Sequence, residues 1–212
     1  MVPEPAPDRY RTACERIDAA NAEDPNEIEI DGERGPKELL HGRWMVRTVR
    51  DLDPGADEVQ LLAARAHHLR RWTVPRADFP EGRAGYLRWR VAARRRHGEE
   101  VRALLRSCGY GDAEADRVAA IVRKERPGED PAVQLHEDAL CLVFLRTQLG
   151  DVAARLGEDH MVDVLVRTLP KMSDRGRAAA ADLPLDEAGR DLLARAVAAW
   201  SAGGPDPSAA GV

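Results

Sequence analysis

Hydrophobic residues recur at intervals of three and four along most of the chain, which is the spacing of one face of an α-helix. The first such segment, RYRTACERIDAANAE, places Tyr10, Cys14 and Ile17 on one face and predicts an amphipathic helix. The helical spacing is lost in DPNEIEIDGERGP, where Ile28 and Ile30 alternate with acidic residues. For that stretch we expect an irregular connection with a short extended piece.

Residues that start and stop helices divide the next part of the chain. Pro36 suits the first turn of a helix covering PKELLHGRWMVRTVRDL. Asp57 is the expected N-cap of EVQLLAARAHHLRRW, and Pro75 should end that helix. A turn-rich loop, TVPRADFPEGRAG, leads into a long helix from roughly Tyr86 to Cys108.

The second half of the chain continues the helical pattern. Asp112 is expected to cap AEADRVAAIVRKE, and the most apolar segment, AVQLHEDALCLVFLRTQLG, is expected to be the central helix. DHMVDVLVRTL, DRGRAAAADL and EAGRDLLARAVAAW follow, the last capped by Asp186. The pattern predicts an all-α fold: one compact bundle of about seven to nine helices over residues 8–200, with disordered segments at 1–7 and 201–212.

Composition supports this fold and indicates a compartment. Of the 212 residues 43% are hydrophobic but only 4% aromatic, so aliphatic side chains must build the core, which favours helix packing. No apolar run approaches the ~20 residues of a membrane span, and MVPEPAPD lacks the features of a signal peptide. We therefore expect a cytoplasmic protein with no membrane contact, whose Cys14, Cys108 and Cys141 are buried thiols.

The charges are unevenly distributed. A net charge of −5 argues against a general nucleic-acid binder, yet ten arginines lie between Arg65 and Arg96, against only Asp78 and Glu81. Arginines match phosphate oxygens two at a time, although a solvated helix face explains the group equally well. The candidate phosphate- or anion-binding residues are Arg70, Arg71, Arg76, Arg88 and Lys124. Trp72 and Trp89 either stack on a base or pack the loop.

Imidazoles and carboxylates on otherwise apolar helix faces are candidates for a metal site, because ligands in a helical protein must converge from several helices. Four predicted helices carry such groups: Glu38 and His41, then His67 or His68, then His97, then Glu137 and Asp138. On the third predicted helix His68 shares a face with Leu61 and Ala64. Asp138 is expected to point into the core, where a carboxylate needs a positive or metallic partner. A structural or surface role is the simpler explanation for each histidine taken alone, and only their coincidence on four helices makes a shared site equally plausible.

The order of these residues resembles that of the HD superfamily of metal phosphohydrolases. His41, His68 and Asp138 follow one another with gaps of 27 and 70 residues, but Leu69 stands where the diagnostic His-Asp pair requires an aspartate. The resemblance implies HD-like architecture and a divalent metal (Mn, Fe, Co, Ni or Zn) that assists hydrolysis of a nucleotide or other phosphate ester. The implied metal ligands come from Glu38, His41, His68, His97 and Asp138, and the implied general base is Glu137 or Glu125.

A closer resemblance covers nearly the whole chain. The segments RYRTACERIDAANAEDPN, PKELLHGRWM, HLRRWTVPR, AGYLRWR and DALCLVFL resemble the domain-of-unknown-function 4202 family. Positions matching that family include Glu38, His68, Arg71, Trp72, Pro75, Arg76, Tyr86, Trp89, His97, Lys124, Glu125 and Asp138. This resemblance implies little about function, but it favours Glu38, His68, His97 and Asp138 as the site.

Two further motifs are incomplete, and two other hypotheses stand beside the leading one. KMSDR, residues 171–175, resembles the KMSKS loop of class I tRNA synthetases, but the chain has no nucleotide-binding fold to accompany it, and Ser173 as a helix N-cap is a simpler explanation. ELLH fits the Glu-x-x-His motif of di-iron bundles, but no second copy is present. The main alternative is a non-catalytic module that binds RNA, tRNA or another anion through Arg65–Arg96, and a scaffold without chemistry is the third.

Overall fold

The computed structural model describes residues 8–203, and in this range the chain is almost entirely helical. Ten α-helices, three 3-10 helices and one two-stranded hairpin are present there, which confirms the all-α fold. The predicted disordered segment 1–7 and most of 201–212 lie outside the described residues. No helix within residues 8–203 is long and apolar enough to cross a membrane.

The chain forms two compact units. The first runs up to residue 50 and from 54 to 125, and the second holds 51–53 and the described residues from 126 onward. The single domain expected over residues 8–200 therefore stays a prediction, and each unit is described by itself.

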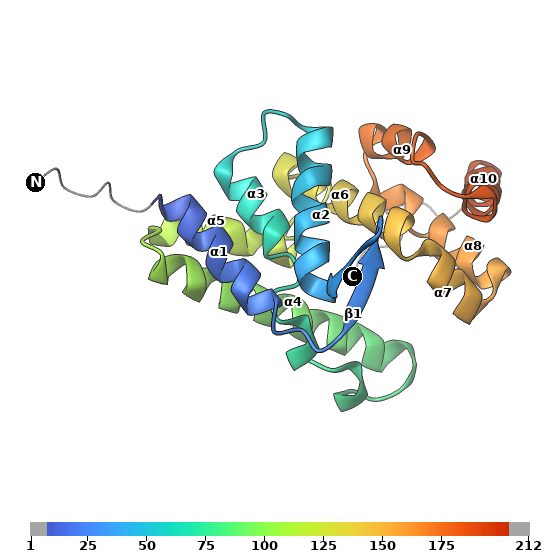
Figure 1. Cartoon of the computed structure of the whole chain (residues 1–212). Helices are drawn as coiled ribbons and strands as arrows, with labels where there is room; N and C mark the ends of the chain where they lie inside the picture. Colours follow the sequence, from blue (N-terminus) through green and yellow to red (C-terminus); the bar gives the residue numbers. More distant parts are fainter. Residues whose placement is uncertain (1–7, 204–212) are drawn as a thin grey trace, which may run out of the picture. The chain divides into compact units, whose positions relative to one another are not determined.

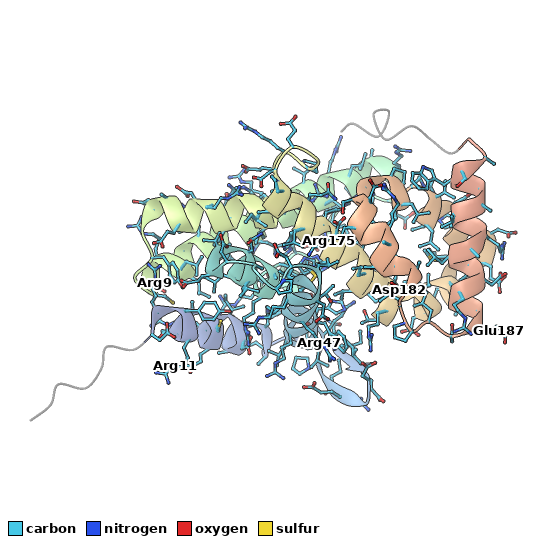
Figure 2. All side chains as sticks on the ribbon, turned by 90° about the horizontal axis from the view of Figure 1, so that it is seen from above. Arg9, Arg11, Arg47, Arg175, Asp182 and Glu187 are labelled. Atoms are coloured by element: carbon cyan, nitrogen blue, oxygen red, sulfur yellow. The ribbon has the colours of Figure 1, made fainter. Side chains whose placement is uncertain are left out.

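The first unit is helical with one small hairpin. Its elements are α1 (Arg9–Asn21), β1 (Glu27–Ile30), β2 (Glu33–Pro36), α2 (Lys37–Leu52), α3 (Glu58–Arg65), η1 (Arg71–Thr73), η2 (Arg76–Asp78), α4 (Gly82–Ser107) and α5 (Asp112–Arg123). In Figure 1, α3 lies between α1 and α5, and α4 packs along α5. Ile17, Leu62, Val101 and Val118 are fully buried where these helices meet. Arg9 on α1 and Glu114 on α5 form an ion pair at the surface, where Figure 2 labels Arg9.

The expected irregular connection is a regular β-hairpin. β1 and β2 pair antiparallel, with Ile30 opposite Glu33, and the turn residues Asp31 and Gly32 have φ of 51° and 81°. Positive φ at both positions of a two-residue turn is the geometry that an Asp-Gly pair favours. The hairpin ends at Pro36, and α2 begins at the next residue.

The helix expected to run from residue 58 to Trp72 ends earlier. α3 stops at Arg65, a series of turns follows, and Arg70 has a left-handed backbone with φ of 51°. Because α3 has already ended three residues before His68, the expected shared face of Leu61, Ala64 and His68 does not exist. His68 is carried by the turn after α3.

The second unit contains α6 (Pro131–Thr147), α7 (Leu149–Leu156), α8 (Glu158–Val166), η3 (Leu169–Lys171), α9 (Asp174–Ala181) and α10 (Glu187–Ser201). α6 packs against α9, and α10 packs against α8 and α7. The sequence pattern missed α7, which is separated from α8 by Gly157 at a φ of 85°. This extra helix brings the number in the described residues to ten, above the expected seven to nine.

Three predicted helix caps are confirmed. The side chains of Asp57, Ser173 and Asp186 each accept a hydrogen bond from the backbone three residues further on. The three cysteines are free; Cys141 is buried, while Cys14 and Cys108 are only half-buried.

Candidate metal centre

The first turn of α2 supplies two groups of the candidate site. Glu38 and His41 are three residues apart, so their side chains lie on the same helix face. Both are buried, and Nδ1 of His41 lies 3.6 Å from Oε2 of Glu38. The local pairing follows directly from the Glu-x-x-His spacing.

His68 joins this pair from the turn after α3. Its Nδ1 lies 3.2 Å from Oε2 of Glu38, and its Nε2 lies 2.9 Å from Nη1 of Arg71. An arginine has no acceptor atom, so Nε2 of His68 accepts, and its proton resides on Nδ1, which donates to Glu38. The side chain is 22% exposed, so the site is open to solvent at this residue.

Close packing and buried polar side chains hold these elements together. A Cβ on Gly42 of α2 would lie 2.5 Å from the carbonyl oxygen of Arg65, so glycine permits α2 to cross the end of α3. Asn21 accepts a hydrogen bond from the backbone N–H of Arg70 and donates one to the carbonyl of Glu38. One amide thus links the end of α1, the first turn of α2 and the turn that carries His68.

Asp24 fixes the start of α2. Its Oδ2 accepts the backbone N–H of Glu38, and its Oδ1 accepts two bonds from Asn26. The sequence analysis assigned no role to Asn21 or Asp24. The sequence feature that indicates a role for them is a cluster of polar residues, NAEDPN, directly after an amphipathic helix. Such clusters typically contain side chains that hydrogen-bond to the backbone.

Arg71 lies beside the cluster and on an aromatic ring. Its Nε is 3.9 Å from Oε1 of Glu38, and its Cζ is 4.7 Å from the centre of the Trp89 ring. Nε1 of Trp89 donates to the carbonyl of Val74, which fixes the ring under the guanidinium. The guanidinium of Arg71, a predicted anion-binding group, therefore lies on a ring that is itself fixed in place.

Two further histidines line the same region. The ring of His67 stacks on that of His68 at 3.5 Å, and the ring of His97 lies tilted 5.6 Å from His68. His97 is only 2% exposed and donates its Nδ1–H to the carbonyl of Leu69, while Nε2 has no hydrogen-bond partner among the described residues. A histidine whose Nδ1–H is held by a carbonyl presents its Nε2 lone pair, as metal-binding histidines do.

The surroundings of Glu38 favour its charged form. Burial raises the pKa of this carboxyl, but the hydrogen bond and charge of His41, with the charges of Arg71 and His67, outweigh burial. The pKa of Glu38 is therefore lowered, and the group is an anion at neutral pH.

His68 and His97 are held neutral. Burial is the main cause that lowers the pKa of His68 well below its usual value, followed by the charges of Arg71, His97, His41 and Lys124. Burial also lowers the pKa of His97 to about 4, against the opposing effect of its bond to Leu69. Neutral imidazoles are the form that binds metals.

Glu38, His41 and His68 each offer a ligand atom, and these three atoms lie within 4.8 Å of one another. Within residues 8–203 no other group of three or more histidine, cysteine or acidic residues meets this description. The separations of 3.2 Å and 3.6 Å are close to the ~3.4 Å between neighbouring ligands of a tetrahedral ion with bonds of about 2.1 Å.

Asp138 is not a member of this group and has its own partners in the second unit. It is 3% exposed on α6 and accepts hydrogen bonds from the backbone and hydroxyl of Ser173 and from Nε2 of Gln134. A Cβ on Gly176 would lie 2.6 Å from its Cγ, so the start of α9 packs directly on the carboxyl. These contacts satisfy a buried carboxylate without a metal.

The two predicted general bases also lie outside the cluster. Glu125 is exposed and accepts a hydrogen bond from Nε of Arg123, and Glu137 is buried on α6 of the second unit. Their catalytic assignment stays a prediction.

Several arginines of the Arg65–Arg96 segment are engaged within the protein. Ion pairs join Arg65 to Asp18, Arg95 to Glu99 and Arg96 to Glu100. These pairs reduce the positive charge that the segment offers to an RNA backbone.

The remaining anion-binding candidates differ in their surroundings. Arg76 donates to the carbonyls of Phe79 and Pro80 and so stabilises its own loop, while Arg88 is exposed on α4. Arg70 and Trp72 are half-buried at η1, and Lys124 ends α5 with a φ of 57°.

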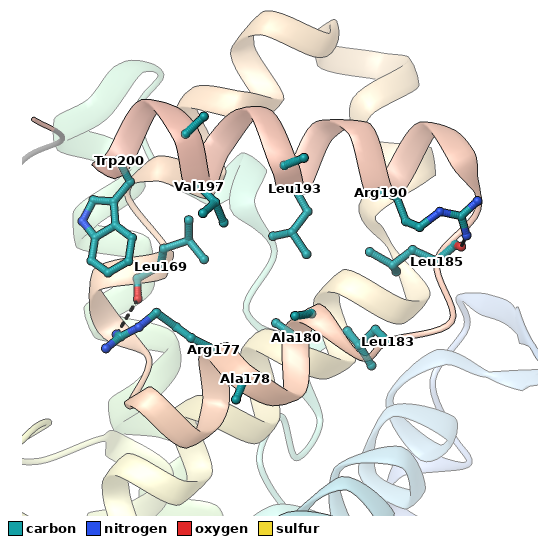
Figure 3. A pocket seen from close by; sticks show the side chains of 13 residues that line it. Leu169, Arg177, Ala178, Ala180, Leu183, Leu185, Arg190, Leu193, Val197 and Trp200 are labelled. Carbon is teal, nitrogen blue, oxygen red and sulfur yellow. Dashed lines mark hydrogen bonds between the residues drawn. The ribbon is translucent and has the colours of Figure 1, made fainter. Parts of the chain in front are cut away.

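A cavity of about 700 Å³ lies in the second unit between α9 and α10 (Figure 3). Leu169, Leu193 and Val197 contribute to its apolar lining, and Arg177 and Arg190 stand at its edges, bonded to the carbonyls of Leu169 and Leu185. The cavity brings no cluster of titratable groups together, so it offers no comparable chemistry.

Comparison with known proteins identifies a family but no activity. The family model described as "Domain of unknown function (DUF4202)" matches residues 11–193, a range that includes the whole cluster. No curated protein and no solved structure matches the chain significantly.

Proposed function

We propose that this chain, which belongs to the DUF4202 family, is a metal-dependent phosphohydrolase whose metal is held by Glu38, His41 and His68. The observation that carries the proposal is the convergence of one ionised carboxylate and two imidazoles beside the guanidinium of Arg71. A structural ion pair needs only one cation for Glu38, whereas this carboxylate is faced by three nitrogen-bearing side chains.

The donor set suits the metals expected from the sequence. Two histidines and one carboxylate hold zinc in hydrolases and iron in several enzyme classes, so Mn, Fe, Co, Ni and Zn all remain candidates. A divalent ion bound there polarises a phosphate oxygen and lowers the pKa of a water molecule. We include His97 as a fourth candidate ligand, because its Nε2 is buried and without a hydrogen-bond partner among the described residues.

The chain's own cations favour an anionic substrate. Arg71 keeps four further N–H donors beyond its bond to His68, and its planar group is held in place by Trp89. It would bind two phosphate oxygens at once and offset the charge that builds up during hydrolysis. Lys124, whose charge reaches His68, adds a second cation on the same site.

This proposal keeps only part of the ligand pattern that the HD resemblance implies. His41 and His68 would act as its early histidines, but Leu69 replaces the aspartate, and its carbonyl holds His97. Asp138 would anchor α9 through Ser173 instead of binding the metal. The proposed centre is therefore a Glu-His-His site and not the HD ligand set.

Metal analysis tests the proposal. Tag-free protein should retain or take up about one divalent ion per chain, and Glu38→Gln and His68→Gln should each lower that content at least tenfold. His160→Gln, an exposed histidine on α8, is the matched control and should bind metal like the wild type. Circular dichroism melts verify that each variant is folded.

Hydrolysis is measured next with β-glycerophosphate as a simple phosphate ester. Metal-loaded wild type should release phosphate, and a chelator should abolish release. Failure of the wild type to bind any of the five metals would refute the proposal, as would equal metal content in Glu38→Gln.

A further inference from the structure

We infer that Tyr86 and Arg90 on α4 form a nucleobase-binding site adjoining the metal centre, so that the substrate is a nucleotide. The inference rests on the proposed function for the position of the phosphate, and on a separate set of contacts for the base. Tyr86 was not among the stacking residues expected from the sequence, whereas Arg90 belongs to the arginine-rich segment Arg65–Arg96.

A continuous series of contacts leads from the metal centre to Tyr86. Arg71 bonds to His68 and lies on the Trp89 ring, and the Trp89 ring lies 5.7 Å from that of Tyr86 at an interplanar angle of 43°. Arg90 lies over the Tyr86 ring at 5.7 Å. The order of these contacts is thus Arg71, Trp89, Tyr86 and Arg90, with two neighbouring aromatic rings between two cations.

The length of this series suits a nucleotide. Its two contacts measure 4.7 Å and 5.7 Å, so the Arg71 guanidinium and the Tyr86 ring lie within about 10.4 Å of each other. A nucleotide spans this order of distance between its base and its phosphates. With a phosphate on Arg71 and the metal, the base would reach Tyr86.

Exposure distinguishes Tyr86 from the two tryptophans. Trp89 is held by Arg71 against its ring and by the bond from its Nε1 to Val74, so it serves as a support. Trp72 is half-buried in η1. Tyr86 is 44% exposed, so part of its ring is accessible to a ligand from solvent.

The chemistry of the pair indicates how a base would bind. An aromatic ring stacks on the face of any base, and a guanidinium stacks on the opposite face or bonds to the base edge. Stacking on one aromatic side chain typically strengthens binding by about tenfold. We therefore expect a preference for purines, which offer the larger ring, without strict selection among bases.

Calorimetry with two ligands that differ only in the base tests the inference. Adenosine 5′-monophosphate and ribose 5-phosphate are titrated into the full chain after treatment with EDTA, so that no hydrolysis occurs. The wild type should bind the nucleotide about tenfold more tightly. Tyr86→Ala should bring the two affinities within twofold of each other, and Tyr86→Trp should preserve the preference. Val91→Ala, also exposed on α4, is the control and should behave like the wild type.

The possible outcomes separate this inference from the proposed function. A base preference that depends on Tyr86 in a protein that never binds metal would support the nucleotide site and refute the hydrolase. Metal-dependent release of phosphate, with equal binding of the two ligands, would refute the nucleotide site alone. Much tighter, strongly salt-dependent binding of a ten-nucleotide RNA would overturn the inference in favour of an RNA surface.

Discussion

At the scale of single residues, the site depends on a balance of charge around Glu38. Burial alone would favour the protonated carboxyl, but the nearby His41 and Arg71 lower its pKa. A buried anion with its cations removed costs several kcal/mol, so the surrounding nitrogen atoms are needed for stability as well as for function. A metal would add positive charge where the carboxylate already attracts it, and it would replace the proton that Nδ1 of His68 donates to Glu38.

His97 makes a specific pH dependence of stability measurable. Its pKa is about 4 in the folded protein, against an ordinary value of 6.5, so in this interval the unfolded chain binds more protons than the folded one. Stability should therefore fall as the pH drops from about 6.5 towards 4. For this residue alone the loss is on the order of 3 kcal/mol.

Urea unfolding in EDTA at several pH values measures the loss. His97→Gln should reduce the slope of stability against pH by about one proton, while the slope of the exposed control His160→Gln should stay unchanged. An unchanged slope in His97→Gln would show that His97 is protonated in the folded state.

At the scale of elements, the crossing of α2 over the end of α3 positions the site. The built Cβ of Gly42 would contact a backbone oxygen of Arg65, which cannot rotate away as a side chain does. Gly42→Ala should therefore push α2 from α3, lower stability by about 1–3 kcal/mol and weaken metal binding. Thermal melts and metal titration measure the two effects.

A second glycine-to-alanine substitution distinguishes the loss of the α2–α3 contact from the general effect of alanine within a helix. Gly150 on α7 has nothing within 4 Å of its built Cβ, so Gly150→Ala should be neutral or stabilising by about 0.5–1 kcal/mol. Equal stability of the two variants would mean that the Gly42 contact is not needed.

The elements also show what the sequence could and could not predict. Helix starts at Asp57, Ser173 and Asp186 were predictable, because an N-cap acts through bonds within three residues. The conformation of the segment after α3 was not, because the left-handed Arg70 within it is bonded to Asn21, a residue 49 positions away. The Asp31-Gly32 turn carried a strong local hairpin signal that the helical pattern around it concealed.

For the whole molecule, the sequence predicted which residues gather around Glu38 better than it predicted how each buried acid is satisfied. Glu38 and His41 share a face because of their spacing alone, and the family resemblance indicated His68. Grouping Asp138 with them assumed that every buried acid needs a metal or a cation. The structure instead satisfies Asp138 with a hydroxyl, a backbone N–H and an amide, a choice that no periodicity reveals.

Glu38, His41 and His68 lie in the first unit and Asp138 in the second, so an experiment that reports on each unit separately tests which of them bind the metal. A metal held by Glu38, His41 and His68 stabilises only the elements that they hold together, by about 2.7 kcal/mol at a metal concentration 100 times Kd. Hydrogen exchange of the full chain, followed by mass spectrometry, should slow by up to about 100-fold in α2 and in the turn after α3 when metal is added.

The same experiment examines the alternative ligand set. Amides of α6 and α9, next to Asp138 and Ser173, should exchange at the same rate with and without metal, and Glu38→Gln should abolish protection in α2. Metal-induced protection of α6 and α9 equal to that of α2 would refute a centre made of Glu38, His41 and His68 alone.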